Sequence, residues 1–172
     1  MNFFIKKKVK KGIKDLKEKL LFVKRVCKVT KGRRYFSFNS IVLKGNYNGT
    51  IGFGFGKAKE ALDAIHKAGS DATKNLINIP IINDTIPHEQ TAKFKGTYVS
   101  IFPATKGTGI ISCWVIRVIL EIAGIKNILS KVIGSYNSKN ITRATMKALS
   151  NLRSIDMILK QRGITLKKLF NG

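Results

Sequence analysis

The sequence predicts an α+β fold in two parts, a three-stranded antiparallel sheet with one covering helix and then a β-α-β-α unit. Two observations carry this prediction. Residues 20–56 hold three strand-like runs, of which the first alternates loosely, the second is rich in aromatic and β-branched residues and the third alternates with glycine. From residue 58 onward, apolar spacing of three and four residues appears and later returns between further strand-like segments. The chain has 172 residues, 44% of them hydrophobic, enough for one domain or two small ones sharing a core.

The sign of the charge is the most unusual feature of the composition. Lys and Arg total 33 against 9 Asp and Glu, for a net charge of +24, although the charged fraction of 24% is ordinary. Such a chain repels itself unless it works beside a polyanion. A small-molecule enzyme without a partner is therefore disfavoured. Of the cations 26 are Lys, which favours contact with backbone phosphates over the reading of bases.

The charge also suggests how the chain is divided. Residues 1–34 carry +12, residues 35–80 carry +2 and residues 81–172 carry +10. We expect residues 1–14 to form a disordered basic tail, because they hold too little apolar surface to order alone. We expect a first domain over residues 15–80 and a second over residues 81–172, with the Pro80–Pro87 segment as the connection.

Cysteine and histidine usage points to a reducing compartment and to no metal. Two Cys and two His lie far apart, without metal-ligand or disulfide spacing. The first residues place a short apolar run before the lysines, the reverse of a secretory signal. The longest apolar stretch, residues 110–125, is interrupted by Arg117 and Glu121 and is too short to cross a bilayer. We therefore expect a cytoplasmic or organellar protein with no membrane contact.

The first part reads as a strand–turn–strand–turn–strand unit and a helix. The strands are expected at residues 20–29, 35–44 and 50–56, joined by turns at residues 31–34 and 46–49. In the third strand Ile51, Phe53 and Phe55 share one face and glycines the other, which lets another backbone approach closely. The helix is expected over residues 58–77, with an apolar stripe of Ala58, Ala61, Leu62, Ile65, Ala68, Ala72 and Leu76.

The second part is expected to alternate strands and helices. Strands are predicted at residues 97–102 and 127–133, and a buried helix at residues 110–123 ends at Gly124. A second helix, capped by Asn140, carries an apolar stripe of Ile141, Ala144, Thr145, Ala148, Leu149 and Leu152. Short helical pieces are expected at residues 154–162 and 165–170.

Two glycine-rich segments invite a nucleotide-site interpretation. Residues 52–57 lack the glycine spacing of a P-loop and of a dinucleotide fingerprint, so Phe53 and Phe55 are interpreted as core. Residues 103–109 resemble the phosphate loop of a small-molecule kinase superfamily, but Ile110 and Ile111 replace its serines. This loop suits a phosphate or protein contact at a helix N-terminus, with a tight turn and no ligand as the alternative. No side chain has catalytic surroundings, so we expect neither enzyme activity nor a cofactor.

A turn with clustered cations is the best candidate for RNA contact. Lys28, Lys31, Arg33 and Arg34 flank a glycine between two strands. On the later helix Arg143, Lys147 and Arg153 occupy the polar side, where an ordinary solvated surface is an equal alternative. His66 is interpreted as structural, and His88 as a loop residue without a catalytic partner.

Several blocks, in order, resemble one known family. They are Lys31-Gly32-Arg33-Arg34-Tyr35-Phe36-Ser37-Phe38, residues 49–58, Thr85-Ile86-Pro87-His88, residues 103–111, residues 120–125, Gly134-Ser135-Tyr136-Asn137 and Arg143-Ala144-Thr145. From about Leu16 onward the chain resembles bacterial-type small-subunit ribosomal protein five.

The resemblance implies a fold and a role. It implies an N-terminal domain similar to double-stranded-RNA-binding domains and a C-terminal β-α-β-α domain related to the kinase superfamily. The implied role is a structural constituent of the small ribosomal subunit that binds 16S-type ribosomal RNA beside ribosomal proteins four and eight. It further implies contributions to subunit assembly, decoding accuracy and the messenger-RNA entry path. The implied location is the ribosome of the cytoplasm or of an organelle.

The resemblance also implies site residues. The RNA-binding set is Lys24, Arg25, Lys28, Lys31, Arg33, Arg34, Lys57, Lys59, Lys106 and Arg143, and the protein-interface set is Gly107, Thr108, Gly109 and Arg117. The first hairpin loop, residues 28–34, is expected near the spectinomycin site. Four positions depart from the family: Arg33 replaces a glycine, Cys113 and Trp114 replace small residues, and Ser138 replaces a proline. A phosphotransferase and a free RNA-annealing factor are the alternative functions.

Overall fold

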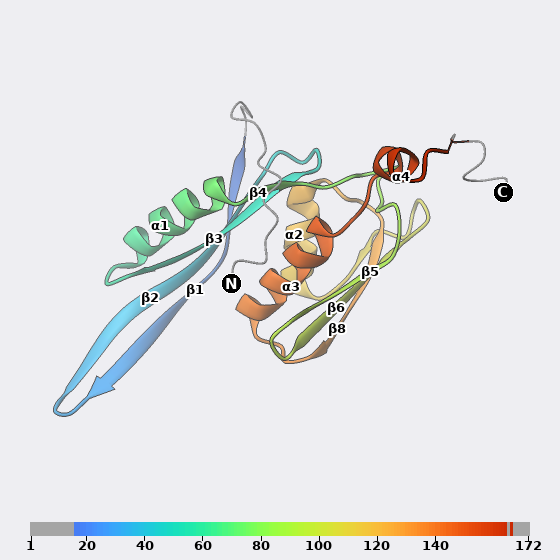
Figure 1. Cartoon of the computed structure of the whole chain (residues 1–172). Coiled ribbons are helices and arrows are strands. Elements are labelled where there is room, and N and C mark those ends of the chain that lie inside the picture. Colours follow the sequence, from blue (N-terminus) through green and yellow to red (C-terminus); the bar gives the residue numbers. More distant parts are fainter. Residues whose placement is uncertain (1–15, 165, 167–172) are drawn as a thin grey trace.

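The protein folds into two four-stranded sheets with helices, as the α+β prediction requires. A computed structural model describes residues 16–164 and 166, so the predicted tail and most of the predicted helical piece at residues 165–170 lie outside the described residues. The first sheet has the order β1-β2-β3-β4 and the second β5-β6-β8-β7 (Figure 1). In the first part the elements are β1 (Lys17–Thr30), β2 (Arg33–Gly45), β3 (Thr50–Ala58), α1 (Ala61–Lys74) and β4 (Leu76–Asn78). In the second part they are β5 (Gln90–Phe94), β6 (Thr97–Pro103), β7 (Ile110–Ile111), α2 (Trp114–Ala123), β8 (Ile128–Gly134), α3 (Ser138–Ser150) and α4 (Ile155–Arg162).

The glycines of β3 let helix α1 lie directly on the first sheet, as the sequence predicts. A Cβ on Gly54 would overlap the carbonyl oxygen of Ala68, and one on Gly56 would overlap that of Ala64. The buried face of α1 is therefore made only of small residues, Ala64, Ala68, Gly69 and Ala72. The broader predicted stripe is wrong at Leu62, which is 70% exposed, because Leu62 lies outside the side of α1 on which Ala64, Ala68 and Ala72 are buried.

Several predicted elements need correction, and most of the corrections have a tertiary cause. The helix expected to reach residue 77 ends at Lys74, and residues 76–78 instead pair with β3 as a fourth strand. Strand β5, which was not predicted, pairs with β6. The helix expected from residue 110 begins at Trp114, because Ile110 and Ile111 pair in parallel with β8. The cap of α3 is Asn137, whose Oδ1 accepts from the amide of Lys139, rather than Asn140.

One hydrophobic core joins the two sheets. It combines side chains of β2 and β3, such as Leu43 and Ile51, with those of α2 and α3. Backbone hydrogen bonds reinforce the contact, because the turn between β2 and β3 donates from Tyr47 and Gly49 to the last carbonyls of α2, at 3.1 and 2.8 Å. The first and second parts of the chain therefore pack against each other and are not joined by a linker alone.

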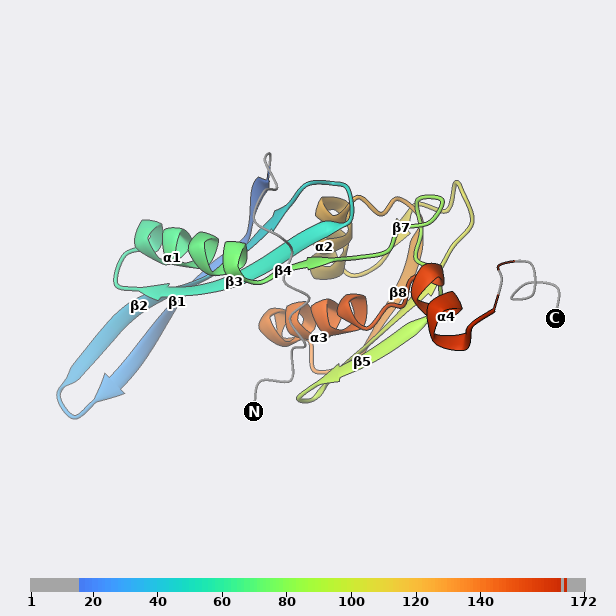
Figure 2. The ribbon, with the colours of Figure 1, turned by 45° about the horizontal axis from the view of Figure 1, so that its top comes forward.

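Two surfaces remain outside this core. Strands β1 and β2 continue beyond the last pair that β2 makes with β3, so residues 26–37 form a projecting hairpin (Figure 1). In the second sheet, helices α2 and α3 lie on one face, and no described helix covers the other face (Figure 2).

Candidate nucleic-acid interface

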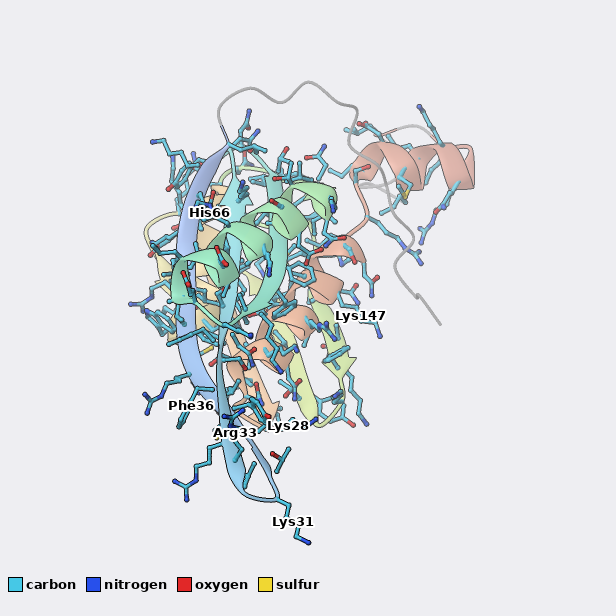
Figure 3. The ribbon with its side chains drawn as sticks, turned by 90° about the vertical axis from the view of Figure 1, so that its left-hand side faces the viewer. Lys28, Lys31, Arg33, Phe36, His66 and Lys147 are labelled. Carbon is cyan, nitrogen blue, oxygen red and sulfur yellow. The ribbon has the colours of Figure 1, made fainter. Side chains whose placement is uncertain are left out.

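The projecting hairpin is a strongly basic part of the structure. No Asp or Glu occurs between residues 19 and 59. Gly32, at a φ of +81°, makes the turn at the hairpin tip, a conformation that glycine adopts without strain. Lys28, Lys31 and Arg33 extend from the distal hairpin, with Lys31 at its tip (Figure 3). The sheet thus presents its cations on a hydrogen-bonded ribbon, away from the rest of the molecule.

Cations occupy both faces of this ribbon. Side chains of directly opposed residues in an antiparallel pair share a face, and neighbours along the strand alternate. Lys28 is opposite Tyr35, whereas Val29 is opposite Arg34. Lys28 and Arg34 therefore point to opposite sides, and the hairpin can contact phosphates on both sides at once.

Exposed aromatic rings lie beside these cations. Phe36 and Tyr35 are 50% and 52% exposed. The Arg25 guanidinium lies 4.7 Å from the centroid of the Phe36 ring, and that of Arg33 lies 6.0 Å from the Tyr35 ring. Such contacts favour one orientation of a long side chain, so these arginines are partly ordered before any ligand arrives.

A second basic group forms where the hairpin meets the second half of the chain. Lys24, Asn39 and Lys57 are direct neighbours across β1, β2 and β3. On the adjacent row, Phe22 and Phe55 flank Ile41. The Lys24 ammonium lies 5.7 Å from the Phe22 ring centroid, which connects the two rows.

Helix α3 completes this group from the other half. The Arg143 guanidinium and the Lys139 ammonium lie 4.9 and 5.0 Å from the Phe55 ring centroid. We name the four cations Lys24, Lys57, Lys139 and Arg143 the basic junction. Sequence reasoning missed Lys139, although its position four residues before Arg143 on a helix was an available signal.

Two further predicted RNA-binding residues belong to neither the hairpin nor the basic junction. Lys59 is exposed after the end of β3, and Lys106 is exposed on the loop between β6 and β7 in the second half. Lys147, offered as a weaker candidate, donates from Nζ to the carbonyl of Lys93 (Figure 3). The structure therefore divides the predicted set among the hairpin, the basic junction and a few outlying members.

The glycine-rich loop at residues 103–109 is differently built from the expectation. It leads into strand β7 and not into a helix N-terminus, so the predicted helix-dipole anion site is wrong. The amides of Gly107 and Gly109 both donate to Asn127 Oδ1, at 3.1 and 3.2 Å. Asn127, which the sequence analysis did not single out, therefore holds the loop in shape.

The four predicted protein-interface residues do come together. Arg117 of α2 donates from Nη2 to the carbonyl of Ile110, directly after Gly109, at 3.3 Å. This contact places the exposed guanidinium of Arg117 beside the loop of residues 107–109.

The described residues contain three ion pairs, Lys19–Glu121, Lys44–Glu18 and Lys126–Asp84. None of them uses a cation of the predicted RNA-binding set. Phe53 is buried and Phe55 partly buried against the core, as their interpretation as core requires. His66 is exposed on α1 (Figure 3), so its structural interpretation is wrong.

Two kinds of feature are absent from the described residues. They hold no cluster of three or more His, Cys, Asp and Glu side chains suited to a metal ion. They also hold no helix with the length and hydropathy needed to cross a bilayer.

Comparison with known proteins explains this architecture. The model of the ribosomal protein S5 N-terminal domain matches residues 16–80, and the model of its C-terminal domain matches residues 92–162. The chain belongs to the ribosomal protein S5 family. The small ribosomal subunit protein uS5 of Karelsulcia muelleri is 56% identical over 92% of this chain and 93% of its own length. Those of Bacteroides thetaiotaomicron and Flavobacterium psychrophilum are each 48% identical over 92% of this chain and 92% and 91% of theirs.

Family membership decides among the functions left open by the sequence. Members of the S5 family are structural constituents of the small ribosomal subunit and not enzymes. The phosphotransferase alternative is thereby excluded, and the prediction of a non-enzymatic ribosomal protein is confirmed. Ribosomal RNA is accordingly a partner of this chain, as predicted.

Proposed function

We propose that the chain holds small-subunit ribosomal RNA with the projecting hairpin and the basic junction. The observation that carries this proposal is the ribbon of residues 26–37, free of carboxylates and with cations on both faces. A structure of this kind can neutralise phosphates of two neighbouring RNA segments and hold them at a fixed separation. Recognition follows backbone shape, because cations on a rigid scaffold contact phosphates and not base edges.

The basic junction extends the same surface toward the second half of the chain. Arg143 and Lys139 reach the Phe55 ring from α3, so RNA bound at the junction contacts both halves together. Lys59 and Lys106 add further phosphate contacts at separate places. RNA contact of this kind supports the wider proposed roles in subunit assembly, decoding accuracy and the messenger-RNA entry path.

A protein interface is proposed at the loop of residues 107–109 and Arg117. The support is the geometry of the loop, in which Asn127 and Arg117 fix an exposed turn. Ribosomal proteins four and eight are the proposed protein partners. The proposed location is a ribosome of the cytoplasm, in line with the bacterial relatives, with an organellar ribosome as the alternative.

Salt dependence of binding tests the hairpin. The full chain is titrated with small-subunit ribosomal RNA at several salt concentrations, as wild type and as the triple variant Lys31→Ala, Arg33→Ala and Arg34→Ala. Each lost phosphate contact lowers the slope of log K against log salt by about 0.7 to 0.9, so we expect a reduction of about 2 to 3. The matched control is the triple variant Lys67→Ala, Lys74→Ala and Lys160→Ala, whose lysines are exposed outside both basic groups.

The comparison between the two triple variants decides the proposal. Equal losses of slope would show that only total charge matters and that the hairpin is no specific site.

A further inference from the structure

The second sheet has an uncovered face with an unexpected composition. By the strand register, its outward rows are Lys93, Tyr98 and Ile133, then Thr91, Ser100 and Lys131, then Phe102, Leu129 and Ile111. We name these nine residues the outer sheet face. Helices α2 and α3 cover the opposite face, where Val99, Ile101 and Val132 are buried (Figure 2).

Five of the nine outward side chains are large and apolar. Ile133 and Ile111 are 58% and 55% exposed, and Tyr98, Phe102 and Leu129 are 41%, 39% and 37% exposed. An antiparallel sheet with one solvated face normally shows polar residues on that face. Apolar side chains gathered on an exposed surface mark a site of interaction.

From this composition we infer that the outer sheet face docks a neighbouring protein whose surface is apolar opposite the two flanking rows and acidic opposite Lys93 and Lys131. The charge argument is local, because none of the residues of β5, β6, β7 and β8 is acidic. Lys131 lies in the middle row, beside Ser100. The Lys93 ammonium lies 4.6 Å from the Tyr98 ring centroid, at the edge of the apolar group. Carboxylates of a partner would therefore find cations at fixed positions and no repelling group on these strands.

The side chains of the outer sheet face favour a protein as its partner over RNA. Three of the five apolar residues, Ile111, Leu129 and Ile133, are aliphatic and offer no flat ring for base stacking. Single-stranded RNA platforms combine aromatic rings with a cationic groove, a combination that this chain places on the hairpin instead.

The inference goes beyond the interface proposed for residues 107–109, because it concerns the face of the sheet and not that loop. It rests on the family's place in the small subunit, where neighbouring proteins are available. It does not depend on RNA contact by the hairpin. A chain missing from the particle would overturn the proposed function, whereas a chain present but undocked would overturn only this inference.

Photo-crosslinking in purified small-subunit particles tests the inference. The probe is the substitution Tyr98→p-benzoylphenylalanine or Ile133→p-benzoylphenylalanine, each in the full chain. The control is Leu62→p-benzoylphenylalanine, at a side chain 70% exposed on α1 in the other half. We expect both outer-face probes to give a protein adduct that survives ribonuclease, at least about tenfold stronger than the control. Adducts to RNA, or no adduct above the control, would overturn the inference.

A matched pair of charge variants gives an independent readout. Ile133→Glu places a carboxylate at the apolar face, and Leu62→Glu places one at the control site. Both side chains point outward, so circular dichroism should show the folded state in each. We expect Ile133→Glu alone to lower retention in salt-washed particles by about tenfold. Equal retention of the two folded variants would overturn the inference.

Discussion

The guanidinium of Arg143 lies between two aromatic rings from different sheets, 4.9 Å from the centroid of Phe55 and 5.2 Å from that of Phe94. Phe55 belongs to β3 of the first sheet and Phe94 to β5 of the second. Arg143 therefore links the two halves in addition to carrying a charge at the basic junction. A residue predicted for RNA contact has a structural role as well.

Replacing Arg143 should destabilise the protein even without RNA. Arg143→Ala removes both ring contacts and the packing of the arginine stem, for an expected loss of about 1 to 2 kcal/mol in the free energy of unfolding. Arg143→Met, which keeps an apolar stem, should lose about half of this. Chemical denaturation of the full chain measures both. Arg153→Ala is the control, since Arg153 is exposed, and a loss equal to that of the control would refute the link between the halves.

The strand and helix patterns could be predicted because they are local. Loose alternation in residues 20–29, aromatic and β-branched residues in residues 35–44 and the glycine alternation in residues 50–56 predicted β1, β2 and β3. The glycine row also predicted the close approach of another backbone. Strands β4 and β7, of three and two residues, carry too little pattern and form because a neighbouring strand offers its edge. These two strands exist because they pair with other strands of the sheet, and a short stretch of sequence does not show that pairing.

The candidate site also has one part that the local sequence predicts and one part that depends on tertiary contacts. The hairpin cations are close in sequence and were predicted together, whereas the basic junction joins β1, β3 and α3 across most of the chain. The contact between Phe55 and Arg143 follows from how the two sheets pack, and neither residue's neighbours in sequence signal it. The outer sheet face could likewise not be predicted from the sequence, because it depends on which face of the second sheet α2 and α3 cover.

The glycine row of β3 should tolerate no side chain. Gly56→Ala would drive a methyl group into the carbonyl oxygen of Ala64, which belongs to the backbone of α1 and cannot turn away. We expect a loss of about 3 kcal/mol or more, since overpacking that forces backbone to move is costly. Gly96→Ala is the control, because its nearest atom would lie 3.9 Å away. Thermal and urea unfolding compare the two, and similar stabilities would contradict the close packing.

Asn127 should control the order of the loop at residues 107–109. It is 7% exposed, and its Oδ1 accepts from the amides of Gly107 and Gly109. Asn127→Ala leaves both donors without this partner, for an expected loss of about 1 to 3 kcal/mol. Hydrogen exchange at the two glycine amides should quicken in the same variant. Asn127→Asp keeps an acceptor oxygen and should retain the slow exchange; fast exchange in Asp and Ala alike, or in neither, would show that this oxygen does not hold the loop.

The two histidines should differ sharply in their effect on helix α4. His88 Nε2 accepts from the backbone amide of Arg153 at 3.1 Å, and the other ring nitrogen, Nδ1, donates to the carbonyl of Glu89 at 2.7 Å. This bond fixes the segment from which α4 begins, and α4 has no buried residue of its own. His88→Ala should therefore cost about 1 kcal/mol and speed amide exchange over residues 153–162. His66→Ala, at an exposed position on α1, should change neither, and an equal response of the two variants would show that α4 is held by other contacts.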